Sequence, residues 1–220
     1  SNLGLLGKGN LSYLGAELNA KDIIFKPAEM LAKADLFDMK EARSGAIQTP
    51  QVHGDSVSIL WRPYRDSMYI SSETAPFAIF QSGKHTVAGT LILTPGGLKG
   101  NGLLEWDKAG LRSKLLSFGA NSVKADTSDI DIRTIGVEGV AIRTKNVNSD
   151  LDFDKKIGKF KANTPGEWTN FPYNQYQTSL NEFIWNMDEE TIVFKSEKGV
   201  KGKFRSVHPD QDSLNFEGET

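Results

Sequence analysis

Apolar and polar residues alternate along much of the chain, in short runs that Gly, Asn, Asp and Pro interrupt. The clearest runs are residues 16–20, 57–61, 68–70, 87–93, 130–132 and 149–153. Alternation places one set of side chains on each face of an extended strand, which is the pattern of a half-buried β-strand. The runs follow one another at the spacing of about 8–12 residues that all-β folds show. The pattern therefore predicts an all-β protein.

This pattern also repeats along the chain. Residues 4–25 and 97–118 align at an offset of 93 residues with nine identities, and further along an offset of 91 residues sets Leu60 on Leu151. Ordered matches at a nearly fixed period are the sequence signature of a repeat architecture. The nine identities are Gly4/Gly97, Leu5/Leu98, Gly7/Gly100, Gly9/Gly102, Leu11/Leu104, Ala16/Ala109, Leu18/Leu111, Lys21/Lys114 and Phe25/Phe118.

We therefore expect one repetitive β structure over residues 1–220, with units of approximately 4–96 and 97–188 and a partial third unit at 189–220. A unit that cannot bury its apolar face alone does so by stacking on its neighbour. The predicted fold class is all-β with a repetitive stacked-strand architecture, either a β-solenoid or an open β-roll. A β-sandwich or two similar β domains are the alternatives.

One segment has a competing helical pattern. Residues 27–39 begin with Pro27, a residue that suits the first position of a helix. The corresponding residues of the second unit, 120–132, have the pattern of a strand. Two copies of one unit should agree, so we expect a strand over most of 27–39 as well.

The glycine cluster at residues 96–102 is the nearest approach to a phosphate-binding loop. Such a loop needs a Gly-Lys-Ser/Thr sequence and a helix after it, and neither follows this cluster. The same glycine spacing recurs at Gly4, Gly7 and Gly9. We therefore interpret these glycines as turns of the repeated unit.

Composition narrows the possible functions. The 220 residues include no Cys, which excludes a disulfide framework, a Cys-ligated zinc site, an Fe–S cluster and a cysteine nucleophile. Three His leave little room for a His-based metal site, and a net charge of −2 gives no basic surface for nucleic acid. No apolar run approaches the ~18 residues of a membrane span. We expect no cofactor, no metal, no nucleic-acid partner and no membrane span in this segment.

One run of polar residues resembles a cation site. Five oxygen-bearing side chains occupy alternate positions from 146 to 154, where one face of a strand would gather them. The spacing does not fit a calcium loop, which needs Gly at its sixth position and Glu at its twelfth. We expect the solvated face of a strand instead, as for other acidic residues of the chain. These residues are Asn146, Asn148, Asp150, Asp152 and Asp154, and then Asp126, Asp129, Asp131, Asp210 and Asp212.

Catalytic signals are weak. His53, His85 and His208 stand far apart in no metal-binding spacing, and a Gly-x-Ser-x-Gly sequence is absent. Glu182 and the acids at 188–190 have no feature that distinguishes them from ordinary surface carboxylates, although glycosidases use such pairs. We expect no enzymatic activity.

Residues 168–185 are rich in aromatic side chains, with Asn and Gln between them. Aromatic faces beside amides are typical of sugar-binding and protein-binding surfaces. Tyr173 and Tyr176 have no counterpart in the first unit and lie in an apparent insertion, so they are the predicted ligand-binding residues. The other four aromatics have the positions of core residues and are Trp168, Phe171, Phe183 and Trp185.

Four phrases carry a family resemblance: Gly97-Leu-Lys-Gly-Asn-Gly-Leu-Leu, Asn121-Ser-Val-Lys-Ala-Asp, Asn170-Phe-Pro-Tyr-Asn-Gln-Tyr and His208-Pro-Asp-Gln-Asp-Ser-Leu-Asn-Phe. Over most of its length the chain resembles long, uncharacterised β-rich repeat proteins of Bacteroidetes-type bacteria. The succession of a strand, Asn-x-Val-x-Ala-Asp and another strand is also similar to the OstA-like lipopolysaccharide-transport fold, a stack of β-rungs open along an apolar seam. Both resemblances imply a non-catalytic part in the cell envelope.

The leading hypothesis is a non-catalytic structural or scaffolding segment of a large bacterial cell-envelope or secreted protein, whose partners are neighbouring repeats of the same parent chain. The alternative is a binding module for glycan or lipid, or for a protein partner, that uses the aromatic surface or an open apolar groove. An unfilled apolar groove along the rungs would favour lipid, and exposed tyrosines would favour glycan.

Overall fold

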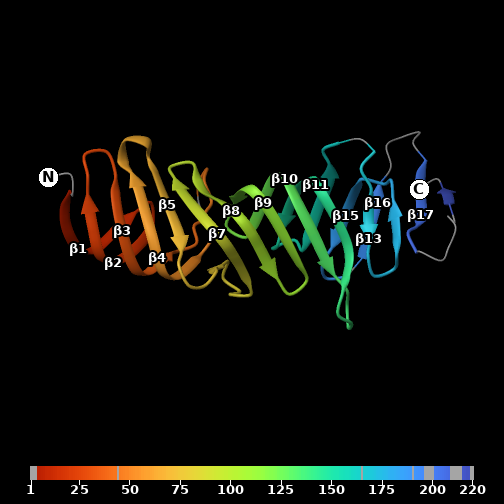
Figure 1. The fold of residues 1–220 in the computed structure, drawn as a ribbon, viewed down its shortest axis with the longest axis horizontal. Helices are drawn as coiled ribbons and strands as arrows, with labels where there is room; N and C mark the ends of the chain where they lie inside the picture. Colours follow the sequence, from red (N-terminus) through yellow and green to blue (C-terminus); the bar gives the residue numbers. More distant parts are fainter. Residues whose placement is uncertain are drawn as a thin grey trace. The chain divides into compact units, whose positions relative to one another are not determined.

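The computed structural model describes residues 4–43, 45–164, 166–189, 191–195, 201–208 and 215–218 (Figure 1). Within these residues 18 strands belong to one large antiparallel sheet, so the all-β prediction is confirmed. In the same part of the chain, no helix is both long enough and apolar enough to cross a membrane. The strands are β1 Leu5–Tyr13, β2 Ala16–Phe25, β3 Met30–Met39, β4 Val52–Arg62, β5 Ser67–Ser72, β6 Phe77–Ile79, β7 His85–Thr94, β8 Gly97–Trp106, β9 Ala109–Phe118, β10 Ser122–Arg133, β11 Val140–Asp152, β12 Ile157–Ala162, β13 Thr169–Phe171, β14 Tyr176–Thr178, β15 Glu182–Asn186, β16 Thr191–Lys195, β17 Gly202–Ser206 and β18 Asn215–Gly218, and a 3₁₀ turn, η1, spans Pro63–Arg65.

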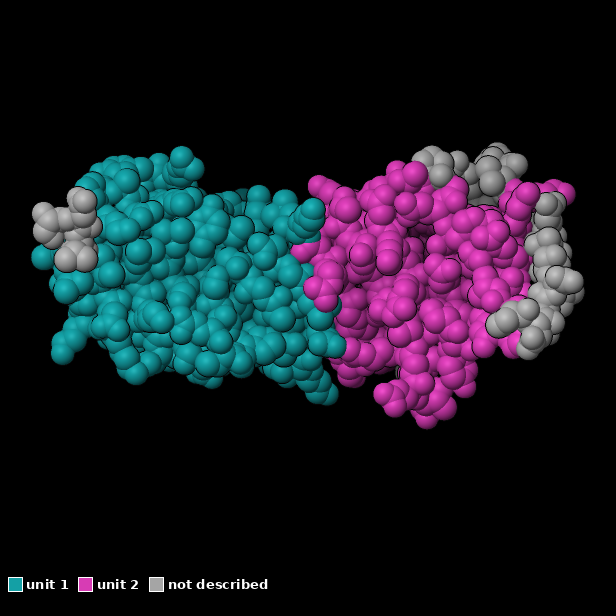
Figure 2. Space-filling view, viewed as in Figure 1, with its two compact units in different colours: residues 1–105, 114–121 teal, residues 106–113, 122–220 magenta. Residues whose placement is uncertain are grey.

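The chain divides into two compact units (Figure 2). Unit 1 contains residues 1–105 and 114–121, and unit 2 contains residues 106–113 and 122–220. Strand β9 therefore contributes residues to both units. The expected sequence units at 4–96 and 97–188 are a separate interpretation, which this division does not test.

The expected alternation sets which side chains are buried. In β2 the apolar set Ala16, Leu18 and Ala20 is buried while the residues between them are exposed. The segment with the competing helical pattern contains strand β3, which begins at Met30 and also alternates. The strand expected over most of residues 27–39 is thus confirmed, because burial on one face of a sheet outweighs a weak helix preference.

Strand pairing in unit 1 divides between the two halves of the long strands. The first residues of β4 pair with β6, while its second half, from Val57 to Arg62, pairs with β5. Strand β7 repeats this division, since its first residues pair with β6 and the segment from Thr90 to Leu93 pairs with β5. Short strands β5 and β6 thus act together as one interrupted strand between β4 and β7.

The same pairing occurs in unit 2. Arg143 of β11 is opposite β13, while the half of β11 from Val147 to Asp152 pairs with β12. Strand β12 then pairs with β15, and β13 pairs with β14. Strands β12 and β13 therefore act together as one interrupted strand, as β5 and β6 do in unit 1.

The long strands bend near their middle. Five of them carry a residue with positive φ at that point, a conformation that straight strands do not use. Ladder irregularities lie close by, for example between Gly7 and Gly9 of β1. Bulges of this kind bend a strand and increase its twist. The five residues are Gly9 (φ +148°), Ser56 (+52°), Gly89 (+154°), Gly102 (+121°) and Asn146 (+52°).

The bends allow each unit to form two facing layers with apolar side chains between them. In unit 2 the carbonyl oxygen of Lys108 accepts a hydrogen bond from the amide of Arg133 at the end of β10 (2.9 Å). The Nζ of Lys108 donates to the carbonyl oxygen of Met187 (2.7 Å), which follows β15 near the opposite end of the paired strands. A straight β10 would separate these two places by about 35 Å. The sheet must therefore fold back on itself, a geometry compatible with both a rolled sheet and a sandwich.

Most of the glycines interpreted as turns lie within strands, so for these the prediction was wrong, whereas Gly96 lies in the turn between β7 and β8. Gly97, Gly100 and Gly102 belong to β8. A Cβ on Gly102 would lie 2.0 Å from the carbonyl oxygen of Ala88, and one on Gly89 would lie 1.9 Å from that of Asn101. These glycines are required because the main chains of β7 and β8 approach too closely for a side chain, a use of glycine found at bends of sheets.

Candidate functional site

The two predicted binding residues lie in one hairpin of unit 2. Tyr173 is in the turn between β13 and β14, and Tyr176 begins β14. Gln175 closes the turn with a φ of +57°. The carbonyl oxygen of Gln175 accepts a hydrogen bond from the amide of Val207 (2.8 Å), which attaches the turn to the residues after β17.

The side chain of Tyr173 is exposed to solvent. Its amide donates to the carbonyl oxygen of Val140 (3.1 Å), and its side chain is 55% exposed. The ring lies beside Gly139, where a Cβ would be 3.3 Å from the Tyr173 Cδ2. Ile135 and Val137, which belong to the same β10–β11 loop as Gly139, are also exposed.

Tyr176 has a different environment. It is half-buried, opposite Phe171 of β13 and Ser206 of β17 in the ladder. The Phe171 ring packs on Phe194, with centroids 5.6 Å apart. Directly opposite residues share a face of the sheet, so Tyr176 lies on the face of Phe171 rather than on that of the neighbouring polar residues.

The other aromatics of this stretch divide between core and surface. Phe183 and Trp185 are buried as predicted, and Phe183 stacks on Phe160 with centroids 4.7 Å apart. Trp168 and Phe171 are only half-buried, so the prediction of a core position does not hold for them. Trp168 immediately precedes the three-residue strand β13 and Phe171 is its last residue. Both residues therefore lie at the ends of a short strand, where neighbouring strands bury side chains less completely.

A row of planar polar side chains lies beside Trp168. Asn170, Gln177 and Arg205 are directly opposite one another on β13, β14 and β17, so they share one face. The Arg205 guanidinium carbon lies 4.3 Å from the centre of the Trp168 ring. That distance is within the range of a cation–π interaction, which holds both groups in place.

The row continues onto β11 and β10. Arg143 is opposite Asn170 and also opposite Asp131. Its Nε and Nη2 donate to the two carboxylate oxygens of Asp131, each at 2.8 Å, and this bond raises the pKa of Arg143. Bidentate pairs of this kind fix the orientation of both groups. We call the set of Asp131, Arg143, Trp168, Asn170, Gln177 and Arg205 the Trp168 face.

The Trp168 face combines the groups that recognise carbohydrates. The Asn and Gln amides both donate and accept hydrogen bonds and the guanidinium groups donate them, so together they can serve both the oxygen atoms and the protons of sugar hydroxyl groups. An indole face offers an apolar surface beside them. The arrangement thus places hydrogen-bonding groups and an aromatic ring together on one face of the sheet.

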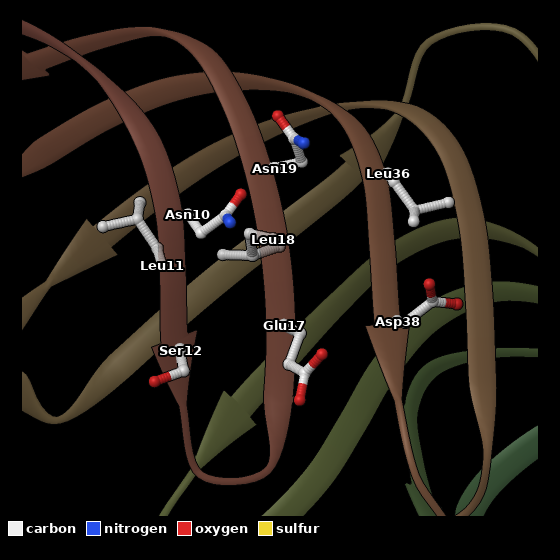
Figure 3. A pocket seen from close by; sticks show the side chains of 8 residues that line it. All are labelled: Asn10, Leu11, Ser12, Glu17, Leu18, Asn19, Leu36 and Asp38. Atoms are coloured by element: carbon white, nitrogen blue, oxygen red, sulfur yellow. The ribbon is translucent and has the colours of Figure 1, made fainter.

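A second candidate is a shallow cavity of about 460 Å³ over the outer face of β1, β2 and β3 in unit 1 (Figure 3). Glu17 and Asp38 lie directly opposite each other in its wall, beside Asn10, Asn19 and Ser12. Leu11, Leu18 and Leu36 also line the cavity, so its wall is mixed in polarity.

His53 adjoins this cavity on β4. Its Nδ1 lies 2.7 Å from the Asp38 carboxylate and its Nε2 lies 3.6 Å from that of Asp55. The hydrogen bond with Asp38 is the main cause of a raised pKa for His53. In the part of the chain that the structure describes, no three His, Asp or Glu side chains are grouped to hold a metal ion.

The acidic row of β11 forms ion pairs with lysines. Asp150 pairs with Lys124 (3.0 Å) and Asp152 with Lys155 (2.8 Å), and the latter bond lowers the pKa of Asp152. Asn146 lies at the bend, where it donates to Thr164 (2.9 Å). The expected solvated strand face therefore holds for residues 148–152, while Asp210 and Asp212 lie outside the described residues.

The remaining catalytic candidates do not converge. His85 contacts Ser82 (3.1 Å), within the same turn of unit 1. Glu182 of unit 2 faces Lys161 at 3.7 Å. Asp188 and Glu189 are exposed in the turn after β15, and Glu190 lies outside the described residues.

Sequence reasoning identified the aromatic stretch but missed most of the Trp168 face. Arg143, Arg205 and Asp131 come from three strands that are far apart along the chain. Only the strand register brings them into one row, and no local signal predicts a register across split strands. The Asn and Gln residues between the aromatics were the one sequence feature that indicated a polar row beside Trp168.

The comparisons with known proteins found no match, whether to a family model, to a curated protein or to a solved structure.

Proposed function

We propose that this chain is a non-catalytic structural segment of a large bacterial cell-envelope protein, in which successive β units stack into one continuous β-roll. The observation that supports this proposal is the split pairing of β4 with β5 and β6, which recurs when β11 pairs with β12 and β13. A chain that uses the same arrangement twice can add further units by the same rule.

The strands that would begin a third unit also show this pairing, in which short strands replace a long one. In the first unit β7 pairs with β8 over its whole length. In the second, β15 pairs with β16 and β14 pairs with β17, so two short strands take the place of each long one. This correspondence supports units near residues 4–96, 97–188 and 189–220.

The function of such a segment is geometric. Each unit buries aliphatic and aromatic side chains between two layers, and its outer faces carry charged pairs such as Lys21–Asp35 (2.6 Å) and Lys124–Asp150 (3.0 Å). Exposed ion pairs contribute little stability, so these faces are free to vary. A scaffold of this kind would space other parts of the parent protein.

Insertion of an extra unit tests the proposal. A second copy of residues 97–188 is placed between residues 188 and 189, and a control carries the same residues in scrambled order. We expect unchanged strand content per residue by circular dichroism, and protection from hydrogen exchange throughout the inserted copy. An inserted copy that exchanges as fast as the scrambled control would contradict stacking units.

The location in the envelope needs its own test. An antibody raised against this chain should detect the parent protein in the envelope fraction of the bacterium that encodes it. Detection in the soluble cytoplasmic fraction alone would overturn this part of the proposal.

Glycan binding is the second candidate function, and the Trp168–Arg205 contact at 4.3 Å is the observation that favours it. On a glycan array we expect binding that Arg205→Ala abolishes and that Arg65→Ala, at an exposed site in unit 1, leaves unchanged.

Tyr173→Ala and Tyr176→Ala test the two tyrosines in the same assay. We expect weaker binding for Tyr173→Ala, because Tyr173 is exposed in the β13–β14 turn, and a smaller change for Tyr176→Ala, because Tyr176 is half-buried. An array without signal for the unmodified chain would remove this function.

A further inference from the structure

Strand β1 forms one edge of the sheet of unit 1. It pairs with β2 from Leu5 to Tyr13, and among the described residues β2 is the strand that pairs with it (Figure 1). Leu5 is 72% exposed and Leu6 is 74% exposed. An edge with large exposed apolar residues is a site at which another strand can add.

Strand β8 shows how a strand with this sequence looks when both of its neighbours are present. It is identical to β1 at four aligned positions, those of Leu5, Gly7, Gly9 and Leu11. Strand β7 pairs with it from Thr86 opposite Glu105 to Thr94 opposite Gly97. Leu98, the counterpart of Leu5, is only 1% exposed. The two strands also differ in pairing, since β7 pairs with β8 along one edge, whereas among the described residues the strand that pairs with β1 is β2.

The glycines of β1 and β8 also indicate that β1 lacks a neighbouring strand of the β7 type. Gly102 of β8 has a φ of +121°, and a Cβ there would lie 2.0 Å from the carbonyl oxygen of Ala88 on β7. Its counterpart Gly9 has a φ of +148°, and a Cβ there would meet nothing within 4 Å. Gly9 thus has the left-handed backbone and the missing side chain that the close approach of a β7-type strand requires.

We infer that the free edge of β1 binds an antiparallel strand of the β7 type, supplied by a preceding unit of the parent chain. The inference rests on the proposed stacking of units and names the contact that joins them. The incoming strand has a glycine opposite Gly9 and an aliphatic residue opposite Leu5, since Gly89 and Leu93 of β7 have these positions opposite Gly102 and Leu98. It would bury Leu5 as β7 buries Leu98.

A peptide tests this directly. A fluorescent peptide with the sequence of residues 83–96 is titrated with the full chain and followed by anisotropy. We expect saturable binding, with at least tenfold weaker binding for the Gly89→Val peptide because its side chain would meet the main chain of β1. A photo-reactive leucine at position 93 of the peptide should cross-link near Leu5.

Variants of the full chain locate the binding edge. Leu5→Lys should weaken binding at least tenfold, whereas Leu14→Lys, at a 46% exposed residue in the turn after β1, should leave it unchanged. Both residues are exposed, so both variants retain the fold, which circular dichroism verifies.

Three results would overturn the inference. They are absence of peptide binding, equal binding of the Gly89→Val peptide, and self-association of the chain through β1 that Leu5→Lys abolishes, because the last would assign the edge to a second copy. Failure of the peptide while the inserted unit of the stacking experiment folds would reject this edge as the joint without rejecting the stacking. If the peptide binds but the inserted unit does not fold, the stacking of units is rejected, while binding of a β7-type strand at the edge of β1 is not.

Discussion

The rings of Tyr13 and Trp61 lie 5.2 Å apart, although the strand register places them at opposite ends of the strands of unit 1. Tyr13 is opposite Ala16, and the same cross-strand row continues through Met39 to Val52. Trp61 lies nine residues further along β4, about 30 Å away in a straight strand. The contact exists because the strands bend, and it holds the two layers together where they meet.

Unit 2 has an equivalent contact. Trp106, which aligns with Tyr13 in the sequence repeat, packs edge-on against Phe153 with centroids 5.5 Å apart. It also stacks on Trp185 at 6.2 Å. In unit 1, burial raises the pKa of the Tyr13 phenol, and the charge of Asp66 adds to this.

Replacing these rings should separate the layers. We expect Trp106→Ala, at a site 5% exposed, to lower the free energy of unfolding by about 3–4 kcal/mol, and Trp61→Ala, which is half-buried, by about 2 kcal/mol. Urea unfolding followed by far-ultraviolet circular dichroism measures both. Tyr64→Ala, at a site 82% exposed, is the matched aromatic control and should change stability by less than about 0.5 kcal/mol. Equal effects at Trp61 and Tyr64 would show that the ring contact does not hold the layers together.

The glycine pair of β7 and β8 should tolerate no side chain. A Cβ on Gly102 would lie 2.0 Å from the Ala88 carbonyl oxygen, and its φ of +121° disfavours any other residue. We expect Gly102→Val to lower the free energy of unfolding by more than about 3 kcal/mol or to prevent folding. Gly96→Ala is the control, because the nearest atom to its new Cβ would be 3.5 Å away. It should stay within about 1 kcal/mol of the unmodified chain.

The sequence predicted what depends on local periodicity. Alternation correctly indicated strands and their buried faces, including β3, where Met30 to Met39 compete with a helical pattern. It failed where the strands bend, because a bend is set by contacts between strands rather than by the residues of one strand. The glycines near position 100 were therefore interpreted as turns, although the approach of β7 to β8 is what requires them.

The candidate site was predicted only in part for the same reason. Tyr173, one of the two predicted binding residues, is exposed in the turn between β13 and β14. Arg143 and Arg205 enter the Trp168 face through the ladder β11–β13–β14–β17. Arg143 and Arg205 are 62 residues apart in the sequence, so a pattern of neighbouring residues cannot predict that they lie on the same face.

The acidic row of β11 should not bind calcium. Asp150 and Asp152 already have lysine partners at 3.0 and 2.8 Å, and calcium would have to displace both. A site with a dissociation constant of about 1 mM would stabilise the fold by about 1.4 kcal/mol at 10 mM calcium. We expect a change below about 0.3 kcal/mol in urea unfolding with and without 10 mM calcium. A larger increase that Asp150→Asn removes would identify a cation site here.

His53 should make a small part of the stability depend on pH. The hydrogen bond to Asp38 raises the His53 pKa above its ordinary value of 6.5, so the folded state holds the proton more tightly than the unfolded state. The resulting stabilisation is fully present below pH 6.5 and is lost as the pH rises through the raised pKa of His53. Because the side chains of His53 and Asp38 are 46% and 44% exposed, solvent screening limits the effect to about 0.5 kcal/mol.

A comparison with His53→Gln by urea unfolding at about pH 5.5 and about pH 8.5 measures this contribution. The unmodified chain should be more stable than the variant at the lower pH and should lose that advantage at the higher pH. In the background of Asp38→Asn the same substitution should produce a much smaller pH-dependent difference, because the group that raises the pKa of His53 most is gone. An advantage that grows as the pH rises would contradict the assignment, since it would mean that the folded protein favours neutral His53.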